Sequence, residues 1–237
     1  MTDELWPGGP RFTSGDGVFK LGTDSVLLAD FVNCTHATRA TDIGCGTGII
    51  AILLALHNPA LVVDGVEINP TAAQLAVHNA AQCGVGNRIS ITLGDVRHHR
   101  ELFTAGAYDL VVSNPPYYAL GSGKQAEDIG IAQARGEAEC TIDDVCMAAG
   151  YLTRWGGAFA LVHKPARLAD LFRALNSAGF EPKRMRFVQN KPESPPSLVL
   201  IESRRGGRPA LIVEAPLILT NADGGDSAEI KRIYHRP

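Results

Sequence analysis

Several common site signatures are missing from this chain of 237 residues. Its five cysteines form an odd number and contain no Cys-x-x-Cys pair, which offers no zinc framework and suits free thiols in a reducing compartment. The seven histidines show no His-Glu-x-x-His spacing, so no metal site is predicted. No apolar run approaches the length needed to span a bilayer, and the acidic first residues lack the pattern of a secretory signal. We therefore expect a cytoplasmic protein without a metal.

The composition is that of a soluble globular enzyme, but charge is distributed unevenly along the chain. Hydrophobic residues make up 45% and charged residues 20% of the sequence, which excludes a mostly disordered protein. Residues 1–150 hold 8 basic against 17 acidic residues, whereas residues 151–237 hold 14 basic against 8 acidic residues. A basic C-terminal third suits an acidic partner, and it suits solvated strand and helix faces equally well.

Segments with strand and helix character alternate after residue 33. Strands are expected at 40–44, 61–69, 89–95, 108–114, 157–163, 183–189, 197–203 and 210–215. Helices are expected at 48–58, 70–83, 141–154 and 165–179. Repeated βα units with short connections predict an α/β fold in a single domain, 1–237, with a mostly parallel sheet, helices on both faces and an antiparallel C-terminal strand. The polar, glycine-rich stretch 119–140 is expected to be a mobile substrate loop.

A glycine-rich loop, DIGCGTG (42–48), follows the first expected strand and opens a helix. This setting lets the backbone approach a ligand. A plain βα turn and the dinucleotide fingerprint GxGxxG are the alternatives, but the spacing here is GxGxG, and Ile49 stands where the fingerprint needs a small residue. Glu67 ends the second strand 23 residues after Gly44, where a carboxylate can accept both hydroxyls of a ribose.

Acidic or amide side chains stand at the ends of four successive expected strands. Each could singly be a helix cap or a turn residue, but together they indicate a ligand site at one edge of a parallel sheet. Several carboxylates suit a cationic sulfonium, whereas they would repel a pyrophosphate, so S-adenosylmethionine is expected rather than NAD. The expected cofactor contacts in these segments are Asp42, Gly44, Cys45, Gly46, Gly48, Glu67, Ile68, Asp95, Val96 and Asn114.

The motifs DIGCGTG, GVEIN, GDV and NPPY, in that order over residues 42–117, resemble those of the class I S-adenosylmethionine-dependent methyltransferases. The segments KLGTDSVLLADF (20–31), SNPPYY, AQARGEAECTIDDV and EIKRIYHRP are similar to those of the bacterial valine-tRNA adenine-N6 methyltransferase family. The resemblance implies a Rossmann-like fold and methyl transfer to the exocyclic N6 amine of an adenine in tRNA. It also implies that Lys20, Thr23 and Asp24, within an N-terminal segment 1–39, cover the cofactor.

The tetrapeptide NPPY (114–117) is the expected catalytic motif. An exocyclic adenine amine is a poor nucleophile because its lone pair is delocalised into the ring. The resemblance implies that the Asn114 side-chain oxygen and the Pro115 carbonyl each accept one N–H, which directs the lone pair at the methyl group. Pro116 would keep the loop preorganised, and Tyr117 would stack on the splayed base, worth about 1–3 kcal/mol. The structural alternative is a proline turn with a core tyrosine.

NPPY does not by itself identify the methyl acceptor. Glutamine side chains of protein release factors are methylated by enzymes with the same tetrapeptide. Those enzymes carry a helical domain before the glycine loop, and the 41 residues before the loop here are expected to be too few for such a domain. DNA enzymes usually add a target-recognition domain, for which we find no candidate. A non-catalytic RNA-binding protein and a small-molecule methyltransferase are further alternatives. A structured RNA fits the basic C-terminal third best. Its expected contacts are Tyr117, Arg135, Arg204, Arg205 and Arg208.

Overall fold

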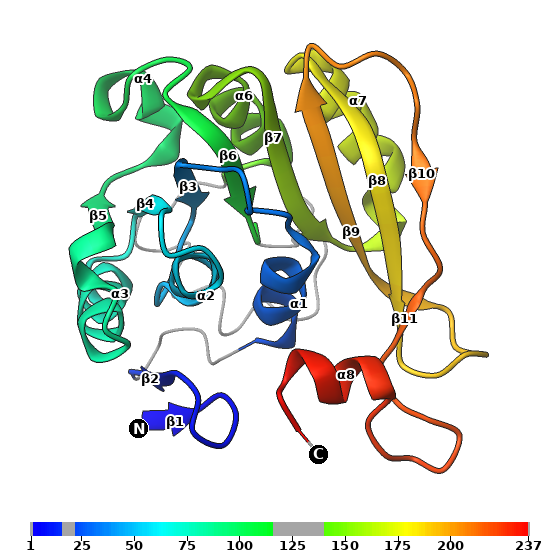
Figure 1. The fold of residues 1–237 in the computed structure, drawn as a ribbon. Helices are drawn as coiled ribbons and strands as arrows, with labels where there is room; N and C mark the ends of the chain where they lie inside the picture. The colour runs from blue at the N-terminus through cyan, green and yellow to red at the C-terminus, as the bar shows by residue number, and fades with distance from the viewer. Residues whose placement is uncertain (1, 16–21, 116–139, 237) are drawn as a thin grey trace, which may run out of the picture.

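The computed structural model describes residues 2–15, 22–115 and 140–236. Within these ranges a nine-stranded sheet forms the centre of the molecule (Figure 1). Its strands are β3 (Arg39–Ile43), β4 (Val62–Glu67), β5 (Ile89–Leu93), β6 (Tyr108–Ser113), β7 (Thr153–His163), β8 (Phe180–Gln189), β9 (Pro196–Arg205), β10 (Ile212–Val213) and β11 (Leu217–Ile218). Their order across the sheet is β10-β8-β9-β7-β6-β3-β4-β5, and β11 also pairs with β8.

Most neighbouring strands are parallel. The pairs β3–β4, β4–β5, β3–β6 and β6–β7 are parallel, whereas β9 is antiparallel to both β7 and β8. The predicted mostly parallel sheet with an antiparallel C-terminal strand is therefore confirmed.

Helices cover both faces of the sheet, as predicted. The helices are α1 (Thr23–Phe31), α2 (Ile49–His57), α3 (Pro70–Gln82), α4 (His99–Leu102), α6 (Ile142–Leu152), α7 (Leu168–Ser177) and α8 (Ala228–Ile233), with short 3-10 helices η1 (Gly86–Arg88), η2 (Val96–His98) and η3 (Pro165–Arg167). One buried cluster joins α1, α2 and α8 to the sheet, and includes Leu28, Ile52 and Ile233. A second cluster lies under α6 and α7 and includes Val145 and Leu171. A hairpin of β1 (Thr2–Glu4) and β2 (Arg11–Thr13) lies beside α3.

Local sequence signals account for two of the helix starts. The Asn69 side chain accepts hydrogen bonds from the N–H groups of Thr71 and Ala72, and Pro70 occupies the first helical position of α3. At the start of α6, the Thr141 hydroxyl accepts from the N–H of Asp144, whose carboxylate accepts from the N–H of Thr141. The helices expected at 70–83 and 141–154 are therefore confirmed.

Several elements differ from the sequence expectations, and β1, β2, β11, α4 and α8 were not expected at all. Helix α1 was not expected either, because its buried residues from Val26 to Ala29 are consecutive and show no 3.6-residue alternation. Strand β8 begins at Phe180 rather than at 183, since Pro182 is tolerated at an irregularity in its pairing with β9. The strand expected at 210–215 is reduced to Ile212–Val213, which lies at the sheet edge.

The expected mobile loop, 119–140, lies outside the described residues except for Cys140. All five cysteines are free, as predicted. Within the described ranges no helix is long and apolar enough to cross a membrane. The same residues contain no group of three or more histidine, cysteine or acidic side chains placed to hold a metal ion.

Candidate functional site

The strand register brings the expected site residues to one edge of the sheet. Ile43, the last residue of β3, pairs with Val66 on one side and with Ser113 on the other. Glu67, the last residue of β4, pairs with Leu93 at the end of β5. Because these strands are parallel, the segments that follow them begin at the same edge, which is where open α/β sheets bind ligands. The glycine loop, Glu67, Asp95 and Asn114 are therefore neighbours.

The glycine loop follows β3 with its backbone in conformations that favour glycine. Gly44 and Gly46 have φ angles of 70° and 55°, and a Cβ built on either residue would meet no atom within 4 Å. The N–H groups of Gly44 and Cys45 donate to the carbonyl of Val66 in β4, which fixes the start of the loop. The loop thus presents bare backbone to open space. Gly48 ends the loop with a φ of 85° and precedes α2.

Glu67 connects the glycine loop to the start of α3. Its Oε2 accepts a hydrogen bond from the N–H of Gly46 at 2.8 Å, and its Oε1 accepts one from the N–H of Asn69 at 2.8 Å. The side chain is buried. Each carboxylate oxygen can accept more than one hydrogen bond, so the backbone contacts orient Glu67 and leave capacity for ligand hydroxyls.

Asp42 is a fully buried carboxylate at the end of β3. Neither of its oxygens accepts a hydrogen bond of standard geometry from the described residues, although the backbone N–H of Ala51 lies close enough to act on its pKa. Burial raises the pKa of Asp42 to about 7; the backbone N–H of Ala51 acts against this rise, and the Glu67 carboxylate adds to it. A carboxylate in this state is stabilised by any cation or donor that enters the site.

Asp95 follows β5 and is already paired in this structure. Its carboxylate accepts from the N–H of Arg97 at 2.9 Å and from the Arg97 guanidinium at 2.5–3.0 Å. These bonds lower the pKa of Asp95 and keep it ionised. Val96, beside it, is buried at the start of η2. Asp95, an expected cofactor contact, is therefore also an ion-pair partner of Arg97. The sequence did not indicate this pairing.

Asn114 lies directly after β6 and contacts helix α1. Its Nδ2 donates to the Ser25 hydroxyl at 3.0 Å, and Pro115 beside it is buried. Ser25 follows Thr23 and Asp24 in the first turn of α1, so the structure brings this N-terminal segment to the NPPY motif. Ser25 was missed by the sequence analysis. Its position directly after Asp24 in the KLGTDS segment was the available signal.

Asn79 is a second residue that the sequence analysis missed. It is fully buried in α3, where its Oδ1 accepts from the N–H of Thr13 at 2.8 Å. Its Nδ2 donates to the carbonyls of Thr13 and Thr47 at 3.2 and 3.0 Å. The amide thus ties strand β2 to the glycine loop. The only sequence signal is that Asn79 falls on the buried alanine stripe of α3.

Four of the expected site residues lie outside the described ranges. They are Lys20, Pro116, Tyr117 and Arg135.

Arg204, Arg205 and Arg208 lie at the other edge of the sheet from Asn114. Arg204 pairs with Ala158 on β7, and Arg205 donates to the carbonyl of Thr153 at the start of that strand. Ser113, just before Asn114, pairs with Leu161, nearer the opposite end of β7. The structure therefore does not bring the three arginines together with the other site residues.

The basic character of the C-terminal third is largely neutralised within the protein. Arg184 pairs with Glu202 and Glu214 at 3.1 and 2.7 Å, and Arg186 pairs with Glu229 at 2.6 Å. Internal pairing, which is neither of the two interpretations offered by the sequence, accounts for these two arginines.

The residues at this edge fit S-adenosylmethionine. The glycine loop leaves room for a ligand against its backbone, and no described residue makes a hydrogen bond of standard geometry to the Asp42 carboxylate. Ile68 and Leu93 are 45% and 57% exposed beside Glu67 and Asp95, which offers apolar surface for an adenine between two carboxylates. Figure 1 shows α1 near the end of β6, in agreement with the contact between Ser25 and Asn114.

Comparisons with known proteins agree with this geometry. The model of the methyltransferase small domain matches residues 10–136. A tRNA1(Val) (adenine(37)-N6)-methyltransferase from Yersinia pseudotuberculosis is 33% identical over 214 residues, covering 89% of this chain and 82% of that protein. An enzyme of the same name from Bacteroides fragilis is 33% identical over 183 residues, covering 77% and 76%.

The fold has counterparts among solved structures. A predicted O-methyltransferase from Agrobacterium tumefaciens has a TM-score of 0.74 at 21% identity, covering 90% of this chain and 96% of that one. This likeness shows the fold alone, and it confirms the Rossmann-like class I methyltransferase architecture. Together with the sequence matches, it leads to one conclusion: the chain belongs to the tRNA1(Val) (adenine(37)-N6)-methyltransferase family of S-adenosylmethionine-dependent enzymes.

Proposed function

We propose that this protein transfers a methyl group from S-adenosylmethionine to the N6 amine of an adenine in tRNA, at position 37 of tRNA1(Val) as in the names of its relatives. The observation that carries the proposal is Asn114, whose amide lies at the carboxyl edge next to the glycine loop and contacts Ser25. Because its substrate is tRNA, the protein acts in the cytosol.

The cofactor is held by the ends of β3, β4 and β5. Glu67 accepts the ribose hydroxyls, and the bare backbone at Gly44 and Gly46 allows close approach. Asp95 accepts from the adenine amine while Ile68 covers one face of the ring. The other residues assigned to this site are Lys20, Thr23, Asp24, Asp42, Cys45, Gly48, Val96 and Asn114. Bound here, S-adenosylmethionine supplies an electrophilic methyl group.

Asn114 and Pro115 hold the acceptor amine. The Asn114 nitrogen donates to Ser25, so the planar amide directs Oδ1 away from Ser25, where it accepts one N–H of the adenine. The Pro115 carbonyl accepts the second N–H, which aims the nitrogen lone pair at the methyl group. Pro116 and Tyr117 complete the motif as a rigid turn and a stacking ring. In such a transfer the N–CH3 bond would form as the S–CH3 bond breaks, with neutral S-adenosylhomocysteine as the leaving group. The methylated ammonium would then lose its proton to water, so no strong base is needed.

Incubation with labelled S-adenosylmethionine tests the proposal. The purified protein should transfer label to tRNA1(Val) transcripts, and nucleoside mass spectrometry should identify the product as N6-methyladenosine. Transcripts with guanine in place of the target adenine should stay unlabelled. Label that appears in a glutamine of a release factor, and not in tRNA, would contradict the proposal.

A further inference from the structure

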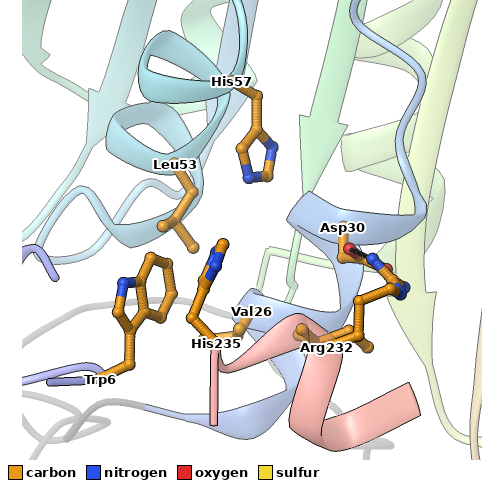
Figure 2. A pocket seen from close by; sticks show the side chains of 8 residues that line it. Trp6, Val26, Asp30, Leu53, His57, Arg232 and His235 are labelled. Atoms are coloured by element: carbon orange, nitrogen blue, oxygen red, sulfur yellow. Dashed lines mark hydrogen bonds and ion pairs between the residues drawn. The ribbon is translucent and has the colours of Figure 1, made fainter. Parts of the chain in front are cut away.

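A separate cavity of about 260 Å³ lies between α1, α2, α8 and the N-terminal hairpin (Figure 2). Its floor consists of the buried apolar side chains of Val26, Leu53 and Ile233. Around this floor lie the rings of Trp6, His57 and His235, together with the ion pair of Asp30 and Arg232. The described lining includes none of the residues assigned to the methyl donor. The cavity is therefore a second site rather than an extension of the first.

His235 is held in a conformation that favours glycine. It is the only non-glycine residue with a positive φ among those that the structure describes, with a φ of 48°. It follows the end of α8, where the N–H of Arg236 donates to the carbonyl of Lys231. Glycine would satisfy this turn without strain. His235 stands in this turn instead of glycine, and its imidazole lines the cavity. Backbone strain of this kind is often found at functional positions.

The other rings are also held in place. The Trp6 indole lies against the backbone of Gly9, where a Cβ would come within 2.3 Å of the ring, and its centroid is 4.6 Å from that of His235. Partial burial lowers the pKa of His57; Asp30 acts in the opposite direction, and the nearby His235 lowers it further. His57 is therefore mainly neutral at pH 7. The Trp6 indole and the His57 ring, over an apolar floor, offer stacking surface.

The charged groups of the described lining, Asp30 and Arg232, lie on one side of the cavity (Figure 2). The Arg232 guanidinium makes two bonds of 2.8 Å to the Asp30 carboxylate, which leaves further donor and acceptor capacity at the cavity edge. Lys231, the neighbour of Arg232 in sequence, is exposed, whereas Arg236 pairs with Asp226 at 2.5 Å. A planar ring with polar edges, carried on an anionic chain, complements these features.

We propose that this cavity binds an unpaired nucleobase of the tRNA other than the target adenine. The proposal rests on the tRNA substrate assigned above. Helix α1 links the two sites, because Ser25 contacts Asn114 whereas Val26 and Asp30 line the cavity. Five residues of helix span about 8 Å, so a nucleotide near the target in the same loop can reach the cavity. Stacking on aromatic and histidine rings is the usual way in which proteins hold splayed RNA bases.

Tryptophan fluorescence gives a direct test. The chain has two tryptophans, so Trp155→Phe leaves Trp6 as the only indole emitter. In this background, tRNA1(Val) should quench Trp6 emission with the cofactor site saturated by S-adenosylmethionine. His235→Gly should keep the melting temperature, since glycine suits the backbone there, and should weaken tRNA binding roughly 5- to 150-fold. S-adenosylmethionine affinity should not change.

A second pair of variants tests whether the loss of tRNA binding in His235→Gly comes from the cavity or only from a change in local structure. His57→Ala removes a ring of the cavity and should also weaken tRNA binding, whereas His78→Ala, an exposed helical histidine on α3, should not. The proposal is overturned if tRNA is methylated while Trp6 emission is unaffected, or if His235→Gly and His57→Ala both bind tRNA like the parent.

Adenosine at millimolar concentration separates this proposal from the assigned function. With the cofactor site saturated, it should quench Trp6 in the Trp155→Phe protein and not after His235→Gly. If no RNA is methylated while adenosine still quenches Trp6, the tRNA function fails and the cavity remains a nucleobase site. If tRNA is methylated and neither probe affects Trp6, only the cavity proposal fails.

Discussion

At the scale of single residues, Asp42 makes the free energy of unfolding depend on pH. Burial raises its pKa from 3.8 to about 7, so the folded state binds its proton more tightly than the unfolded state does. The contribution of this group to stability is therefore fully present below pH 3.8 and is lost as the pH rises to about 7. Asp42→Asn should remove this loss and raise the free energy of unfolding at pH 8 by roughly a few kcal/mol, with little effect at pH 3.5. Urea denaturation at several pH values measures the difference.

Asp109 provides a control of the opposite sign. Burial alone would raise its pKa, but hydrogen bonds from Thr38, Arg154 and Arg39 outweigh burial and lower it. Asp109→Asn should therefore destabilise the protein at pH 7, and the loss should shrink as the pH falls below 3.8. If both variants had the same pH dependence, the contrast between the two carboxyl groups would be wrong.

Glu67 and Asn114 should separate cofactor binding from chemistry. Glu67→Gln brings an amide NH2 against the N–H of Gly46 or of Asn69, so S-adenosylmethionine affinity should fall about tenfold or more. Asn114→Ala should leave that affinity nearly unchanged and lower kcat roughly 100-fold, because its acceptor bond forms to the reacting amine. Calorimetry and single-turnover assays distinguish the two effects. Asn114→Asp, which keeps an acceptor oxygen, is the matched control and should retain more activity than the alanine variant.

At the scale of elements, the buried Asn79 amide joins α3, β2 and the glycine loop. Asn79→Ala would leave the N–H of Thr13 and the carbonyls of Thr13 and Thr47 without this partner. We expect a loss of about 2–4 kcal/mol in the free energy of unfolding and weaker S-adenosylmethionine binding, since the loop loses its support. Denaturation and calorimetry measure the two effects. His78→Ala, one position away on the exposed face of α3, should change neither.

The elements that the sequence predicted are those with strong local signals. The alternation of apolar strands and helices identified β3 to β9 within a few residues, because each is a short run rich in apolar or β-branched residues. Helix α1 and strands β1 and β2 depend instead on tertiary packing. The apolar residues of α1 are consecutive rather than periodic, and β1 and β2 are only three residues long, so neither periodicity nor propensity reveals them.

The same division holds for the site. The acidic strand ends and the glycine loop follow from motif order and from the rule that ligands bind at the carboxyl edge of a parallel sheet. The partners of these residues could not be predicted. The contacts of Ser25 with Asn114 and of Asn79 with Thr47 are made across the fold, and no spacing in the sequence encodes them. Arg97 lies only two residues after Asp95, but the acidic strand ends alone gave no reason to pair the two.

At the scale of the whole molecule, the placement of Arg204, Arg205 and Arg208 makes their contribution depend on RNA length. They lie at the opposite edge of the sheet from Asn114, so only an RNA that extends well past the target loop can reach both. Replacing the three arginines with serine should weaken the binding of full-length tRNA and leave the binding of a short stem-loop substrate unchanged. For every arginine that pairs with a phosphate, its removal should lower the slope of log affinity against log salt by roughly 0.7 to 0.9. Equal effects on the two RNAs would contradict this arrangement.

The packing of α8 on α1 has a consequence for protein synthesis. Arg232 binds Asp30 from 202 positions further along the chain, so the helix that supports Asn114 is held by residues that are synthesised long after it. Strands β3 to β6 can pair earlier, but α1 cannot reach its final packing until α8 has left the ribosome. The nascent chain thus acquires its glycine loop well before its acceptor site is complete.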